Sequence, residues 1–323
     1  MNVSYRHLTL LERERIMIML SQGKKYTEIV HCLKRSVSTI SRELKRHSLT
    51  EYRASLAQAS YQKHRQKCKA VPKLQQPAYR HLVQTKVLEE KWSPEQLSHR
   101  LKWEVADLSI SYNTIYRAVY QGWFDVGERK ASRKLRHKGK TRQTKNHHEK
   151  RGKIAISHSL GERPLSAQNR SRFGHWEADT VLGISGGACL VTLTERKSRF
   201  ELVKKVAVKK SALVSEAIIG LLKHQKLRSI TPDRGKEFAK HRLVSEALGV
   251  EFYFPDPHQP WQRGTNENTN GLLREYFPKQ QDINQWNDDD IQSVVDKLNL
   301  RPRKCLGWKT PYEVYFKKSL HLV

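Results

Sequence analysis

The sequence predicts a multidomain chain, with an all-α N-terminal region followed by an α/β C-terminal domain. Apolar residues recur at helical spacing in the first half, where serines stand at the expected helix starts. The second half contains strand-like runs that alternate with helical segments. Charge divides the chain in the same way. Residues 1–150 contain 32 basic and 13 acidic residues, whereas residues 151–323 contain 29 and 19.

The formal net charge of +29 predicts a polyanionic partner, most simply nucleic acid. An anionic membrane is the weaker alternative, because no apolar run approaches the ~18 residues of a spanning helix. The N-terminal segment MNVSYRHLTLLERER lacks the apolar stretch of a signal peptide. Four widely spaced cysteines without a Cys-x-x-Cys pair favour a reducing compartment and argue against a zinc site. We therefore expect a cytoplasmic protein with no membrane partner.

Residues 1–50 are predicted to form a helix-turn-helix. Helices are expected over 9–22 and 27–34, and Ser36 is placed to cap a third. Val37, Ile40 and Leu44 share one face of this third helix, and its other faces carry hydroxyl and basic side chains. A recognition helix of this kind contacts base edges and phosphates. The alternative is a three-helix bundle with a solvated basic face. The candidate DNA contacts are Ser38, Thr39, Arg42, Lys45 and Arg46.

Residues 51–128 are expected to be mainly helical, with a second helix-turn-helix at about 92–121. Ser93 followed by Pro94, with Gln96 three residues after the cap, is a strong helix start. Ser111 is then placed to cap a helix that, like the third helix of residues 1–50, has an apolar face and exposed polar and basic side chains. The alternative is a helical hairpin with only a packing role. The candidate DNA contacts are Asn113, Thr114 and Arg117.

Residues 129–165 form a basic linker in this interpretation. Nine lysines or arginines and no acids lie between Arg129 and Lys145, and few apolar side chains accompany them. Such a segment cannot build a core, so we expect it to follow DNA phosphates, with Arg133 and Arg136 among its contacts.

The C-terminal half has a distinctive order of elements. Three strands that fit an antiparallel meander are followed by helix, strand, helix, strand and helix. This is the order of the ribonuclease-H-like fold of integrase cores, and we assign residues 166–323 to such a domain with a C-terminal helical tail. The expected strands cover 174–183, 188–195, 200–206, 228–233 and 250–254, and the first two helices cover 210–224 and 236–248.

Three separated carboxylates point to a metal site in this domain. Side chains alternate along a strand, so Glu177 and Asp179 share one face and repel each other unless a cation or water intervenes. Asp233 ends a later strand, and Glu267 opens a helix 34 positions further on. Taken singly, the acidic strand is equally typical of an edge facing water, and Glu267 of an ordinary first-turn glutamate.

The oxygen-rich donor set predicts two Mg²⁺ ions, with Mn²⁺ as a substitute. Asp179 is expected to bridge both ions, Asp233 to hold one and Glu267 the other. Trp261 and Arg263, in the loop before this helix, are candidate DNA contacts. Asn270 and Arg274 lie one and two turns beyond Glu267, where they are expected to hold DNA phosphate.

Several long motifs resemble the insertion-sequence-thirty family of bacterial transposases. They are GHWEADTVLG, TPDRGKEFAKH and YFPDPHQPWQRGTNENTNGLLREYFPK, and STISRELKR, SPEQLSHRL…TIYRAVY and LNLRPRKCLGWKTPYEV extend the resemblance over nearly the whole chain. The resemblance implies a DDE triad at Asp179, Asp233 and Glu267, with a basic residue at Arg274. One departure is Arg234, because the family usually has asparagine there. An arginine at this position can pair with Asp233 or contact DNA phosphate.

The resemblance implies a DDE transposase that binds terminal inverted repeats, cleaves 3′ ends and transfers them into target DNA. Its partners are double-stranded DNA, as element ends and target, and further copies of the chain in a homodimer or larger assembly in the bacterial cytoplasm. One alternative is a catalytically inactive DNA-binding regulator whose integrase-like domain only dimerises. A nuclease for RNA·DNA hybrids fits less well, since it needs neither two helix-turn-helix units nor a basic linker.

Overall fold

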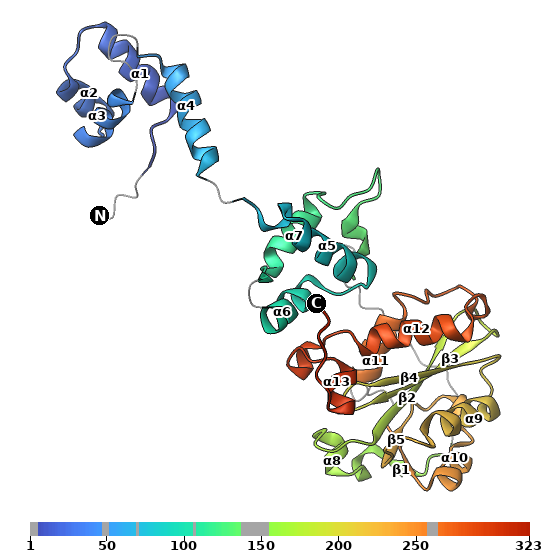
Figure 1. Ribbon diagram of the computed structural model, residues 1–323. Helices are drawn as coiled ribbons and strands as arrows, with labels where there is room; N and C mark the ends of the chain where they lie inside the picture. Colours follow the sequence, from blue (N-terminus) through green and yellow to red (C-terminus); the bar gives the residue numbers. More distant parts are fainter. Residues whose placement is uncertain (1–5, 47–51, 69–70, 106–107, 137–154, 257–263) are drawn as a thin grey trace. The chain divides into compact units, whose positions relative to one another are not determined.

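The computed structural model describes residues 6–46, 52–68, 71–105, 108–136, 155–256 and 264–323 (Figure 1). The chain divides into two compact units, Met1–Pro72 and Lys73–Val323. The break falls at Pro72 rather than at residue 50, because Tyr52 and Ala57 are buried in the same core as the first three helices. The N-terminal unit is therefore larger than the sequence suggested.

The described residues of the N-terminal unit form four helices. The three helices of the expected helix-turn-helix are present, and the Ser36 side chain accepts from the backbone N–H of Thr39 at the start of the third. Ile40 and Leu44 are buried as expected, but Val37 is 62% exposed, so the apolar face of this helix is narrower than predicted. The helices are α1 (Leu10–Ser21), α2 (Tyr26–Leu33), α3 (Val37–Lys45) and α4 (Ala54–Lys67).

The second unit begins with a helical part that has its own apolar core, which includes Leu97, Leu101, Ile115 and Val119. Ser93 and Ser111 cap their helices as the sequence predicted. Ala131 is buried in the same core, so the expected linker starts within a packed region. The elements are η1 (Lys73–Gln75), α5 (Pro77–Leu82), η2 (Val83–Glu89), α6 (Pro94–Glu104), α7 (Tyr112–Tyr120) and η4 (Ala131–Lys134).

A mixed six-stranded sheet follows, with the strand order β1-β6-β5-β2-β3-β4. β2, β3 and β4 pair antiparallel, whereas β5, β6 and β1 continue from β2 in parallel. This arrangement confirms the predicted α/β ribonuclease-H-like topology, to which the two-residue β1 is an addition. The strands are β1 (His158–Ser159), β2 (His175–Leu182), β3 (Cys189–Glu195), β4 (Glu201–Val206), β5 (Ser229–Thr231) and β6 (Glu251–Phe254).

Apolar cores cover both faces of this sheet. Trp176 and Val191 belong to the core shared with α9 and α10, whereas Val181 and Leu190 belong to the core shared with α11 and α12. Every residue of β3 is buried for this reason. Since side chains alternate, Asp179 shares the sheet face of Val181. The helices are α8 (Leu165–Gln168), α9 (Ser211–Leu222), α10 (His241–Leu248), α11 (Gly264–Leu273), α12 (Asp288–Asn299) and α13 (Pro311–Phe316), with short turns η5 (Leu160–Glu162), η6 (Lys236–Phe238), η8 (Ile283–Gln285) and η9 (Lys304–Leu306).

Two expected elements differ in extent. The helix predicted over 236–248 is divided into η6 and α10, and the strand predicted over 228–233 is shortened to β5. β1 and η5 precede residue 166, and β1 pairs with β6 of the sheet. The α/β domain therefore starts earlier than expected. Within the described residues, no helix is both long enough and apolar enough to cross a membrane.

Candidate active site

Two of the three predicted acids lie on or just after neighbouring strands of the sheet. β2 and β5 pair in parallel with Glu177 opposite Thr231. Asp179 lies two residues beyond Glu177 on β2, and Asp233 lies two residues beyond Thr231, just after β5 ends. Asp179 is half-buried and Asp233 is 8% exposed. Both acids therefore follow the last residues that pair between β2 and β5.

Asp179 is held in position by three neighbours. Its Oδ1 accepts from the backbone N–H of Thr180 at 2.8 Å, and its Oδ2 accepts from Asn270 Nδ2 at 3.0 Å. The Thr192 hydroxyl donates to the backbone oxygen of Asp179 at 3.2 Å. Because these contacts come from β2, β3 and α11, the carboxylate has a fixed orientation.

Asp233 lies in a tight turn that leaves no room for a side chain at Gly235. Its Oδ1 accepts from the backbone N–H of Gly235 at 2.7 Å, and a Cβ at Gly235 would collide with the Glu237 carboxylate. Glu237 itself accepts from the Lys209 ammonium at 2.6 Å. The Arg234 Nε donates to the Pro255 carbonyl oxygen at 2.6 Å, so this side chain is engaged with the backbone near β6.

Glu177 has a structural partner that the sequence did not reveal. The Arg196 guanidinium forms a buried ion pair with it, which compensates the charge of this acid of β2. Glu177 Oε2 also accepts from the backbone N–H of Asn266 at 3.3 Å, and Asn266 Nδ2 donates to the Ala178 oxygen at 3.2 Å. The first turn of α11 is thereby fastened to β2 beside Asp179.

Glu267 lies in the first turn of α11, as predicted, and is exposed. Asn270, one turn later, donates to Asp179, and its expected contact with DNA phosphate remains a prediction. Among the described residues, no three His, Cys, Asp or Glu side chains lie close enough to hold a metal ion. The structure thus places one acid on β2, one just after β5 and the third on α11, which packs against β2 and β3.

The predicted contacts of α3 and α7 lie on the surface. Ser38, Arg42, Lys45 and Arg46 are exposed and Thr39 is half-exposed. The Thr39 and Ser38 hydroxyls also contact the capping Ser36 hydroxyl, at 2.8 and 3.1 Å. On α7, Asn113 and Arg117 are exposed and Thr114 is half-exposed. These exposures match the expected recognition surfaces, and the contacts to DNA remain predictions.

The remaining predicted contacts differ in their surroundings. Arg133 is exposed, whereas the Arg136 Nε lies 3.4 Å from Glu275 Oε1 and its terminal nitrogens donate to Asn268 Oδ1. Arg136 therefore packs against the C-terminal part of the domain instead of projecting freely from a linker. Arg274 is half-buried and donates to the Phe277 oxygen at 3.4 Å, and burial lowers its pKa. Trp261 and Arg263 lie outside the described residues.

His175, at the start of β2, was not singled out by the sequence. Its Nδ1 lies 2.7 Å from the Ser229 hydroxyl and its Nε2 lies 3.0 Å from the Ser166 hydroxyl. Burial lowers the pKa of His175 to about 4, and the arginines around it, Arg228 first among them, act in the same direction. The ring is therefore neutral at neutral pH and acts as a packed, hydrogen-bonded part of the sheet.

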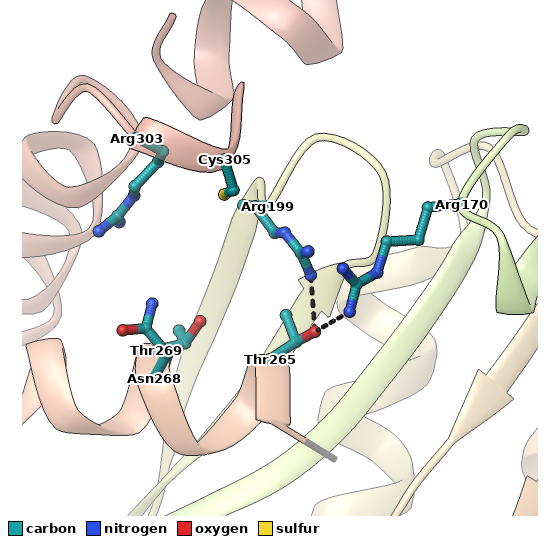
Figure 2. A pocket seen from close by; sticks show the side chains of 7 residues that line it. All are labelled: Arg170, Arg199, Thr265, Asn268, Thr269, Arg303 and Cys305. Carbon is teal, nitrogen blue, oxygen red and sulfur yellow. Dashed lines mark hydrogen bonds between the residues drawn. The ribbon is translucent and has the colours of Figure 1, made fainter. Parts of the chain in front are cut away.

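An arginine-rich pocket of about 260 Å³ lies on another side of α11 (Figure 2). Thr265 and Thr269 line it from the helix, and Arg170, Arg199 and Arg303 line it from three other segments. The turn that bears Arg199 is fixed by Glu195, which accepts from the backbone N–H groups of Lys197 and Ser198. The basic runs Arg170-Ser-Arg172 and Arg196-Lys-Ser-Arg199 were the available sequence signals.

Comparison with known proteins gives consistent matches. Residues 4–47 match a family model described as a helix-turn-helix domain. The chain is 39% identical over 320 residues to the transposase InsI for insertion sequence element IS30A of Escherichia coli K12, covering 95% of this chain and 83% of that protein. It is 36% identical over 326 residues to the transposase for insertion sequence element IS1086 of Cupriavidus metallidurans, covering 96% and 94%.

Among solved structures, the chain is similar to the catalytic core domain of BIV integrase. The identity is 19%, the match covers 44% of this chain and 93% of that one, and the TM-score is 0.35. The assignment of the fold therefore rests on the strand order and pairing of the sheet.

Proposed function

Since the chain belongs to the IS30 family of insertion-sequence transposases, we propose that it binds the ends of its own element, cleaves their 3′ ends and joins them to target DNA. The observation that carries the proposal is that Asp179 and Asp233 follow the parallel pairing of β2 with β5, with α11 hydrogen-bonded to β2. The match of residues 4–47 to a helix-turn-helix domain supports DNA binding by the N-terminal unit.

The donor set fits hard divalent cations, because Asp179, Asp233 and Glu267 offer carboxylate oxygens and neither thiol nor imidazole. These three residues would hold Mg²⁺ or Mn²⁺. When bound, two such ions supply activation of the attacking oxygen and stabilisation of the leaving oxygen. Glu267 completes the set from the helix, and the helix dipole favours its negative charge in the first turn.

The surrounding side chains position these acids. Asn270 and Thr180 fix the two oxygens of Asp179, and the Glu177–Arg196 pair fixes the helix that bears Glu267. A carboxylate that is already oriented loses little entropy when it acts, which favours catalysis. The Gly235 turn has the same effect on Asp233.

Cleavage and joining are the same displacement with different nucleophiles. In cleavage, the oxygen of water attacks the phosphorus and the 3′ oxygen of the element end leaves as a hydroxyl. In joining, that hydroxyl attacks a target phosphodiester and displaces another 3′ oxygen. One site serves both steps. Because two element ends must be joined, we propose a homodimer or a larger assembly on DNA.

The test compares end binding with end cleavage for Asp179→Asn and Glu267→Gln. Both variants should bind an end duplex as the wild type does and lose cleavage, because each removes one anionic ligand. Glu246→Gln, an exposed change of the same kind on α10, should retain both. Near-normal cleavage by either site variant would refute the assignment of the three acids.

A non-enzymatic DNA-binding regulator is the second candidate. It is favoured by one observation, namely that no three candidate ligand side chains gather within the described residues. A regulator binds the element ends but does not cleave them with any divalent cation. The same assay therefore separates the two functions.

A further inference from the structure

The arginine-rich pocket beside α11 concentrates positive charge around one neutral oxygen. Arg199 Nη1 donates to Thr265 Oγ1 at 2.6 Å, and Arg170 Nη2 donates to the same oxygen at 3.3 Å (Figure 2). Two guanidinium groups thus converge on a hydroxyl that carries no charge. No ion pair among the described residues includes Arg170, Arg199 or Arg303. The convergence is the arrangement expected of a site that receives an anion.

The backbone has unfavourable φ angles at two of these arginines. Arg170 has a φ of 56° and Arg199 a φ of 64°, both in the left-handed region that residues with a Cβ rarely adopt. Such conformations persist where the surrounding structure requires them, often at functional sites. Here the constraint comes from Glu195, which accepts from the Ser198 hydroxyl and backbone and so shapes the turn before Arg199.

The charge on the third arginine is also poorly balanced. Arg303 Nε is buried and has no hydrogen-bond partner among the described residues. Glu201 acts electrostatically on Arg303, but burial raises the pKa of Glu201 and so disfavours the charged form of this carboxyl. The pocket is small for a drug-sized ligand but has room for a compact oxyanion.

We propose that this pocket binds one phosphate group of a DNA backbone, with Arg170 and Arg199 donating to its oxygens and the Thr265 hydroxyl donating a further bond. The proposal rests on the proposed function, because it supplies a DNA contact next to the site. Thr265 and Thr269 present one side of α11 to the pocket, whereas Asn266 and Asn270 present another side to β2 and Asp179. A phosphate in the pocket would therefore anchor a strand against the helix that bears Glu267.

The test measures duplex binding against salt concentration without divalent cations, so that cleavage does not enter. The double variant Arg170→Gln/Arg199→Gln should bind more weakly, and its log–log salt slope should fall by about 0.9, the value for one lost phosphate contact. Arg199→Lys keeps the charge and should keep most of the slope. Arg172→Gln is the matched control, since it removes an exposed arginine near Arg170 outside the pocket, and its slope should equal that of the wild type.

Cys305 provides an independent readout, because it lines the pocket and its thiol is free and exposed. Alkylation of Cys305, followed by mass spectrometry, should be slowed by duplex DNA in the wild type and not in the double variant. Circular dichroism confirms that the variants are folded. Inorganic phosphate is the second arm of this experiment and distinguishes a free anion from a backbone phosphate.

An unchanged salt slope in the double variant, together with unchanged protection of Cys305, would overturn the proposal. Protection by inorganic phosphate but not by duplex would also overturn it, since the pocket would then serve a free anion. If the wild type does not cleave element ends, but its salt slope of duplex binding still exceeds that of the double variant, only the proposed chemistry is refuted. The two proposals therefore fail separately.

Discussion

Arg100 on α6 and Glu313 on α13 form a buried ion pair with two parallel hydrogen bonds, although they are far apart in the sequence. Nη1 donates to Oε2 at 2.9 Å and Nη2 donates to Oε1 at 2.7 Å. Arg100 Nη2 also donates to the Leu320 oxygen at 2.7 Å, and Glu104 pairs with the Arg100 Nε. The pair joins the second helical part of the chain to the C-terminal tail of the α/β domain.

The first prediction concerns the stability of this pair. Burial alone would lower the pKa of Arg100, but hydrogen bonds to Glu313 and Glu104 outweigh it and raise the pKa. Glu313→Gln leaves the guanidinium partly uncompensated and should lower the free energy of unfolding by about 3–5 kcal/mol in urea titrations. Glu246→Gln, which is exposed, should change it by less than about 0.5 kcal/mol. A loss below about 1 kcal/mol for Glu313→Gln would show that the pair contributes little.

The second prediction concerns Asn270, which donates to Asp179 Oδ2. Asn270→Ala removes this bond without removing a charge, and it should lower end cleavage about 10–100-fold while end binding persists. The Mg²⁺ dependence of the cleavage rate is the measurement, since a poorly oriented Asp179 should require more metal. Asn284→Ala, at an exposed position in η8, is the control. Equal cleavage by both variants would mean that Asp179 needs no support from α11.

The third prediction concerns pH and His175. Its pKa is lowered to about 4 by burial and by nearby arginines, whereas its unfolded value is 6.5, so the unfolded state binds the proton more tightly. The stabilisation is complete above the unfolded pKa and is lost as pH falls toward the folded pKa. Between pH 7 and about pH 5, the wild type should lose about 2 kcal/mol relative to His175→Gln.

Urea titrations of both proteins at the two pH values measure this difference. Burial also lowers the pKa of His241, and that group is common to both proteins, so the comparison isolates His175. Parallel pH profiles for the two proteins would show that His175 titrates normally in the folded state.

The fourth prediction concerns base reading by α3. Arg42→Ala should weaken binding to the element's own end by about 1–3 kcal/mol and leave random DNA binding nearly unchanged, if Arg42 contacts a guanine. Lys45→Ala should weaken both equally, because a phosphate contact carries no sequence information. Anisotropy titrations with the two duplexes make the comparison. An equal loss on both duplexes for Arg42→Ala would reassign this residue to phosphate.

The sequence predicted the elements whose patterns are local. β2 was predicted because Val181 and Leu182 suit a strand and glycines follow them, and β3 because apolar and β-branched residues dominate it. Ser36, Ser93 and Ser111 were recognised as caps because serine side chains accept from the free backbone N–H groups of a first helical turn. The antiparallel pairing of β2, β3 and β4 also followed from the order of elements. The break between η6 and α10 was missed, since nothing in the composition of that segment interrupts its helical periodicity.

The contacts that set the site's electrostatics depend on distant residues and were not predictable in this way. The Glu177–Arg196 pair and the Asn270–Asp179 bond arise only when β2, β3 and α11 pack together. The bond from Asn270 to Asp179 was not predicted, and the predicted contact of Asn270 with phosphate stays a prediction. The convergence of Arg170 and Arg199 on Thr265 likewise depends on tertiary packing, although each basic run is visible in the sequence.

The most direct test of the central claim uses the purified protein and a labelled duplex that carries the element's own end, incubated with Mg²⁺, Mn²⁺ or Ca²⁺. Our account predicts a nick at the end that leaves a 3′-hydroxyl with Mg²⁺ or Mn²⁺, and none when the metal is chelated. Glu267→Gln should bind the same duplex and leave it intact. Tight, salt-sensitive binding by the wild type with no nick under any metal would contradict the account and indicate a DNA-binding regulator.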